Sequence, residues 1–182
     1  MIKFALSFIL LTYYIQGKTQ VYMPDDAGSK VHFSIKNFGI NTGGDLHGLK
    51  GNINFIPSSL IKSSLNVSVD VKTIDTDNGT RDEHLRSSSY FDEENFPTIV
   101  IKSTKIDKTN KIGGGWYYFT GTLTMHGITK SISFPFTATS KNEDYLFTGT
   151  FDINRLDFGV GSNSSVLSKT VKVSLSVLAR KR

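Results

Sequence analysis

Residues 65–72, LNVSVDVK, decide the fold class, because apolar and polar residues alternate there without interruption. Leucine and valine occupy the odd positions, and Asn66, Ser68, Asp70 and Lys72 occupy the even ones. Successive side chains of a β-strand point to opposite faces of its sheet. A period of two therefore predicts a strand with one buried face and one face in water.

The same alternation recurs from residue 30 onward and predicts further strands. Apolar and polar residues alternate in this way at 31–35, 49–55, 99–101, 117–125, 132–136, 145–153 and 171–177. The pair His126-Gly127 supplies a tight turn before the strand at 132–136. Pro135 lies inside that strand, which predicts a sheet edge, a bulge or a place where no ladder hydrogen bond is needed.

Eight amphipathic strands must hide their apolar faces in a sandwich or a closed barrel, and closure alone removes the exposed sheet edges. We therefore expect an all-β fold, an eight-stranded antiparallel β-barrel. Periodicity leaves open whether aromatic rings plug its centre or leave room for one small ligand. The candidate interior residues are Phe33, Val67, Val69, Ile99, Ile101, Phe119, Leu123, Phe134, Phe136, Phe151, Val173 and Leu175.

Polar residues are dense and the alternation stops in residues 80–101, TRDEHLRSSSYFDEENFPTIVI. Thr80 is the predicted N-cap of one or two helical turns that reach Ser87, because Glu83 follows at capping-box spacing. The segment is thus expected to form a short helical lid between two strands. Its motif residues are Arg81, Asp82, His84 and Leu85, of which Arg81 and Asp82 are expected to make contacts within the lid rather than with a ligand.

The lid segment, R-D-x-H-L-R followed by F-P-T-I-x-I-x-S, resembles the signature of the YceI-like family. Residues 121–130, GTLTMHGITK, and 153–160, INRLDFGV, resemble two further motifs of that family, and residues 31–35, VHFSI, resemble its start. The similarity runs from about Tyr22 to Ala179. It implies a lipocalin-like barrel, periplasmic or secreted, whose apolar cavity holds a polyisoprenoid or another long-chain lipid.

Lys3 and the uncharged run at residues 4–15 predict a signal peptide that ends near residue 17. The run is too short to span a bilayer, which needs ~20 apolar residues. We therefore expect export, a single domain over residues 18–182 and no transmembrane span in the mature chain. The sequence contains no cysteine, and so neither a lipobox thiol nor a disulfide nor a thiolate metal site.

No catalytic, metal or nucleic-acid site is predicted. Asp82 and His84 have serines nearby, but the chain contains no G-x-S-x-G nucleophile elbow. The four histidines, His32, His47, His84 and His126, lie on different predicted elements and show no H-x-x-x-H spacing. The net charge of +5 falls to about +4 without Lys3, and the remaining cations are interleaved with polar residues rather than clustered.

Residues and resemblance together predict an exported carrier or sequestering protein for a long-chain lipid or isoprenoid, with no cofactor and no enzymatic activity. The alternative is a non-catalytic interaction or stress-response module that binds lipid incidentally. A small-molecule hydrolase is a weaker third hypothesis. Whether the chain forms a homodimer stays open at this point.

Overall fold

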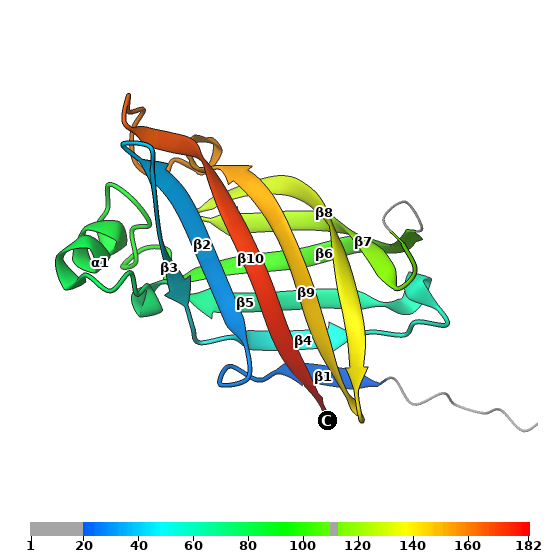
Figure 1. The fold of residues 1–182 in the computed structure, drawn as a ribbon. Coiled ribbons are helices and arrows are strands. Elements are labelled where there is room, and N and C mark those ends of the chain that lie inside the picture. The colour runs from blue at the N-terminus through cyan, green and yellow to red at the C-terminus, as the bar shows by residue number, and fades with distance from the viewer. Residues whose placement is uncertain (1–19, 110–112) are drawn as a thin grey trace, which may run out of the picture.

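The computed structural model describes residues 20–109 and 113–182, so the predicted signal peptide lies outside the described residues. Ten strand segments and one α-helix occur within them (Figure 1). The strands are β1 (Val21–Pro24), β2 (Lys30–Asn37), β3 (Ile40–Leu46), β4 (Lys50–Asn54), β5 (Ser64–Asp70), β6 (Thr98–Thr109), β7 (Trp116–Met125), β8 (Ile128–Lys141), β9 (Asp144–Asn154) and β10 (Leu167–Lys181). The helix is α1 (Gly79–Arg86), and the short 3₁₀ turns are η1 (Leu60–Lys62), η2 (Val71–Thr73) and η3 (Arg155–Phe158).

The strands close into the predicted eight-stranded antiparallel barrel. The order β1-β4-β5-β6-β7-β8-β9-β10 returns to its start, because β1 pairs with the end of β10 through Met23 opposite Arg180. β2 follows β1 along the same edge of β10, where Val31 lies opposite Leu175, and β3 pairs with β2. Every pairing is antiparallel, and α1 lies at one end of the barrel (Figure 1).

The alternation missed two strand segments, β1 and β3. β1 has four residues, too few to show a period. β3, INTGGDL, has two glycines in the middle of the strand, where alternation would require larger residues. Both glycines permit close backbone contacts: a Cβ atom at Gly43 would lie 2.1 Å from the carbonyl oxygen of Phe33, and one at Gly44 would lie 2.4 Å from that of Asp75.

Pro135 occupies one of its predicted places, a local sheet edge. It pairs with Tyr118 of β7, while the pairing of β8 with β9 begins only at the next residue, where Phe136 lies opposite Gly149. The missing N–H of proline therefore leaves the β8–β9 ladder intact. The predicted tight turn at His126-Gly127 is also confirmed, since both residues have positive φ between β7 and β8.

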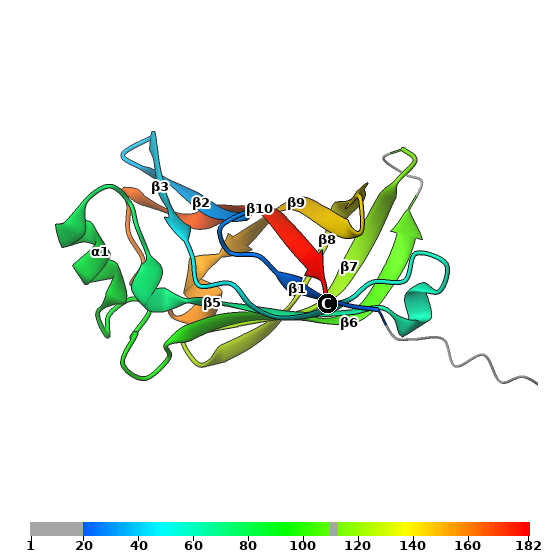
Figure 2. The same ribbon diagram turned by 90° about the horizontal axis from the view of Figure 1, so that it is seen from below.

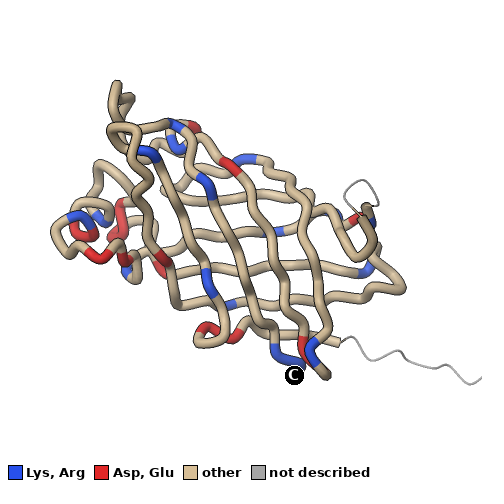
Figure 3. The backbone as a smooth tube through the Cα atoms, in the orientation of Figure 1, with Lys and Arg blue, Asp and Glu red and all other residues tan. Residues whose placement is uncertain are grey.

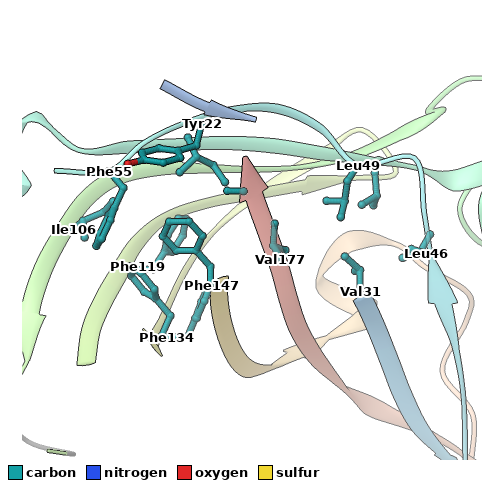
Figure 4. Packing of buried hydrophobic residues seen from close by; sticks show 14 of the residues in the cluster. Tyr22, Val31, Leu46, Leu49, Phe55, Ile106, Phe119, Phe134, Phe147 and Val177 are labelled. Atoms are coloured by element: carbon teal, nitrogen blue, oxygen red, sulfur yellow. The ribbon is translucent and has the colours of Figure 1, made fainter. Parts of the chain in front are cut away.

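The half of the barrel away from α1 is filled by side chains. Phe55 is 1% exposed, and its ring lies edge-on to the rings of Tyr117, Tyr145 and Phe147 at 5.1, 5.3 and 5.3 Å. Figure 4 shows Phe55 and Phe147 converging from different parts of the chain. Burial raises the pKa of the Tyr117 phenol, which therefore stays neutral in this packing. This half of the interior is a close-packed aromatic core.

Candidate functional site

The half of the barrel next to α1 contains a cavity of about 370 Å³. This volume falls within the usual range of small-molecule sites, ~300–1,000 Å³. All twelve predicted interior residues line the cavity, and the lid residues Arg81, His84 and Leu85 line it too. The contact of these residues with a ligand stays a prediction.

The cavity is closed at its inner end and open beside α1. Ile53 and Phe147 belong to both its wall and the packed core, whereas Phe55, the centre of that core, does not line it. The exposed residues Asn37, Arg81 and His84 also belong to the wall, and they mark a mouth between the β2–β3 turn and α1. The barrel is therefore plugged in one half and open in the other.

Three aromatic rings form a stack on one side of the cavity. The ring centroids of Phe119 and Phe134 are 4.9 Å apart, and those of Phe134 and Phe151 are 4.4 Å apart. Small residues make room for them: a Cβ atom at Gly121 would lie 2.7 Å from the Phe119 ring, and one at Gly149 would lie 3.1 Å from the Phe134 ring. These rings therefore line the cavity instead of plugging it.

The lid helix begins earlier than the sequence predicted. Asn78, not Thr80, is the N-cap: its backbone is extended, and its side-chain oxygen accepts a hydrogen bond from the Arg81 N–H at 3.0 Å. Asparagine caps helices at least as well as threonine, so the residue types alone could not separate the two positions. The helix then runs over Gly79–Arg86, close to the predicted range.

Asp82 and Arg81 anchor the lid through Thr76. The buried Asp82 carboxylate accepts hydrogen bonds from the Thr76 N–H at 3.0 Å and the Thr76 hydroxyl at 2.5 Å. Arg81 donates to the same hydroxyl at 2.8 Å and to the Thr76 carbonyl at 2.5 Å. Both side chains thus contact Thr76, which precedes the lid segment, and Arg81 is held at the cavity mouth.

His84 and Asp82 make different contacts. The His84 ring lies 4.7 Å from the ring of Tyr90, and no hydrogen bond joins it to Asp82 among the residues described. Leu85 packs against the main core and accepts a backbone hydrogen bond from Phe91 at 3.0 Å. The two polar residues therefore do not form a paired acid and base.

We expect Asp82→Ala to lower the free energy of unfolding by about 1–3 kcal/mol, because the buried Thr76 N–H would lose its acceptor. Urea denaturation measures the loss. Glu83→Ala is the matched control, since Glu83 is an exposed carboxylate on the same helix and should change stability far less. Equal losses for the two variants would show that the hydrogen bonds of Asp82 to Thr76 add nothing measurable to stability.

Arg155 is not among the residues predicted from the sequence, yet it is buried at 3% exposure and lines the cavity. Its guanidinium donates from Nε to the carbonyl of Ser168 at 3.0 Å, from Nη1 to that of Val160 at 2.7 Å, and from Nη2 to that of Ser162 at 2.8 Å. It therefore links η3, the loop after it and the start of β10. The 153–160 motif contained this residue, but no local pattern indicated that its side chain turns inward.

The charged side chains in the wall all carry the same sign. Arg81 and Arg155 are cationic, His32 and His84 also line the cavity, and no aspartate or glutamate belongs to the described wall. Acidic residues gather instead on and around α1 (Figure 3), and none of them lines the cavity. The described wall therefore offers no carboxylate to pair with a positively charged group.

Residues 20–109 and 113–182 contain neither a cluster of metal ligands nor a helix that could span a membrane. No group of three or more His, Asp or Glu residues is arranged to hold a metal ion there. No helix in this part of the chain has the length and apolar character needed to cross a membrane.

Comparisons with known proteins agree with this architecture. The family model described as a YceI-like domain matches residues 22–179. A UPF0312 protein of Vibrio parahaemolyticus is 30% identical over 158 residues, covering 80% of this chain and 82% of that protein. The crystal structure of Burkholderia cenocepacia BcnA is similar, with a TM-score of 0.81, 24% identity and coverage of 86% of this chain and 99% of that one. A polyisoprenoid-binding domain from Saccharophagus degradans, implicated in plant cell wall breakdown, gives a TM-score of 0.71 at 15% identity, covering 88% and 98%.

Proposed function

Because the chain belongs to the YceI-like family, we propose that its barrel binds one long-chain lipid, a polyisoprenoid or a fatty chain, and carries or sequesters it without catalysis. The observation that carries the proposal is the apolar cavity of about 370 Å³. Protein interiors are normally close-packed, and an empty space of this kind weakens a core. The similar Saccharophagus domain, described as polyisoprenoid-binding, supports the same ligand class.

Binding would work by burial of the ligand's apolar tail. An alkyl or isoprenoid tail enters beside α1, lies along the stacked rings of Phe119, Phe134 and Phe151, and stops at the packed core. Each CH₂ group removed from water contributes ~0.8 kcal/mol, so ten would contribute about 8 kcal/mol before ordering costs. The head group stays at the mouth near Arg81 and His84, where a neutral or anionic group fits better than a cation.

Val173→Trp is expected to displace the ligand. Val173 lines the cavity and is half-buried, so a larger side chain there fills the space that the tail would occupy, at an overpacking cost of ~1–3 kcal/mol. The matched control is Thr150→Trp on the exposed outer face of the neighbouring strand β9. Native mass spectrometry of protein from a lipid-containing host should show an adduct in the wild type and the control, and little in Val173→Trp.

Two outcomes would contradict the proposal. If the wild type carries no adduct and added lipids leave its melting temperature unchanged, the carrier function is wrong and the interaction module remains. An adduct with a cationic head group would contradict the part of the proposal that concerns the mouth.

We also propose that the protein is exported to the periplasm or secreted. The support is the predicted signal segment, with its uncharged run at residues 4–15 after Lys3. The same mass spectrum, recorded on protein from the native host, should show a chain that lacks about the first 17 residues. A mass that includes Met1 would contradict export with cleavage.

A further inference from the structure

The β2–β3 turn places large apolar side chains in solvent beside the cavity mouth. Phe38 is 74% exposed and Ile40 is 72% exposed, and the Phe38 N–H donates to the carbonyl of Val166, also exposed, at 3.0 Å. We call Phe38, Ile40 and Val166 the apolar tip. Figure 2 shows the turn projecting beyond the barrel wall. Its neighbours Asn37 and Leu167 line the cavity, so the tip adjoins the mouth.

The backbone at Phe38 is unfavourable for this residue. Phe38 and Gly39 form the two-residue turn with φ of 49° and 78°, a conformation that favours Asn-Gly and is strained for a bulky side chain. His126 has the same φ of 49° in the β7–β8 turn, but it contacts the Phe96 ring and the Phe158 carbonyl. The ring of Phe38 has no comparable packing. Strain without packing points to a role outside the fold.

Three lysines lie on β2 and β10, the strands that lead to the apolar tip. Lys36 precedes it on β2, and Lys169 and Lys172 follow it on β10; all three are exposed, and none forms an ion pair among the residues described. Asp152 is the register partner of Lys172, which leaves this group of four residues with a net charge of 3 − 1 = +2. The acidic residues on and around α1 lie apart from the β2–β3 turn (Figure 3). The tip therefore combines apolar and cationic groups.

We propose that the apolar tip docks on an anionic lipid membrane, with Phe38 and Ile40 in the interface and the three lysines at acidic head groups. This combination of exposed aromatic and basic residues is typical of interfacial binding. Membrane docking goes beyond the binding of lipid in the cavity, because it assigns the surface at which lipid would pass between the protein and a bilayer. Docking would bring the cavity mouth to the bilayer.

A second copy of the chain fits the tip less well than a membrane does. Three side chains at a turn supply far less than the ~800 Å² per partner that a stable protein interface buries. A two-fold contact through this surface would also bring the lysines of both copies together. A membrane interface accepts a small projecting tip and attracts its cations.

Vesicle sedimentation tests the docking, with phosphatidylcholine vesicles alone or mixed with phosphatidylglycerol. The mature protein, without the predicted signal peptide, should bind the mixed vesicles and bind pure phosphatidylcholine weakly. Phe38→Asn should lower the partition coefficient roughly tenfold or more, as expected for withdrawing a phenyl ring from an apolar medium. Each of Lys36→Gln and Lys169→Gln should lower it about fivefold. Ile40→Thr, which keeps a β-branched residue in β3, should also weaken binding.

We also expect the melting temperature of Phe38→Asn to stay unchanged or to rise, because asparagine adopts the backbone conformation of this turn more easily than phenylalanine. The matched control is Ile61→Asn, an 88% exposed apolar residue in η1, at the opposite end of the barrel from the turn (Figure 1). Its vesicle binding should equal that of the wild type.

Four results would overturn the docking inference. They are an absence of wild-type binding to mixed vesicles, an equal loss in Ile61→Asn, a fall in melting temperature in Phe38→Asn, and a concentration-dependent dimer that Phe38→Asn abolishes. Direct loading with detergent-solubilised hexadecanoate, read by native mass spectrometry, should be the same in Phe38→Asn and wild type. This separates the two proposals, since docking can fail while the cavity still binds lipid.

Discussion

Phe55→Ala is expected to lower the free energy of unfolding by about 3–5 kcal/mol while leaving lipid binding intact. The Phe55 ring is fully buried and contacts the rings of Tyr117, Tyr145 and Phe147. Its removal leaves a space in the plugged half that the surrounding rings cannot fill. Phe55 does not line the cavity, so the tail of a ligand should still fit. Urea denaturation and native mass spectrometry measure the two effects.

Phe151→Ala is the matched comparison, since Phe151 is also an aromatic residue that faces the interior. It is half-buried and stacks on Phe134 in the cavity wall, so its removal enlarges a space that already exists. We expect Phe151→Ala to lose less stability than Phe55→Ala and to bind the ligand more weakly than the wild type. The reverse pattern would show that the barrel is not divided into a packed half and a binding half.

Arg155→Met should lower the free energy of unfolding by about 3 kcal/mol or more. The variant keeps much of the side-chain volume but removes the donors to the carbonyls of Val160, Ser162 and Ser168. An unsatisfied buried acceptor costs ~1–3 kcal/mol, and partial access of water to the exposed Ser162 reduces the sum. Hydrogen exchange should locate the loss at η3 and the start of β10.

Arg155→Lys separates charge from geometry in the same experiment. Lysine keeps the positive charge but lacks the planar guanidinium that reaches three carbonyls at once. We expect a stability between those of wild type and Arg155→Met. If Arg155→Met unfolds at the same urea concentration as wild type, the guanidinium does not hold this end of the barrel together.

The inward face of the barrel was predictable because it depends on a local rule. Alternation assigns each residue of a strand to one face, and the twelve residues chosen on that basis all line the cavity. Closure followed from the need to cover strand edges. The alternation did not predict β3, because Gly43 and Gly44 interrupt it. These glycines are needed where the backbone of Phe33 and of Asp75 comes close, and a local sequence pattern does not show such contacts.

The division of the barrel interior into a packed half and a cavity could not be predicted from the sequence. It depends on the combined volume of side chains from several strands that are distant in the sequence. Phe55 and Phe151 are the same residue type and both face inward, yet one is packed among rings and the other lines the open space. The inward turn of Arg155 likewise depends on carbonyls up to 13 residues away in the chain. Such features become visible only when distant segments are placed together.

The pairing of β1 with β10 has a consequence for the order of folding. The ring closes through contacts such as the ion pair of Asp25 with Arg180, whose partners are 155 residues apart in sequence. Contacts this distant make all-β domains slow folders, on a scale of about milliseconds to seconds. A nascent chain cannot complete the barrel until β10 has left the ribosome. Until then the apolar strands stay accessible, which gives chaperones time to hold the chain unfolded.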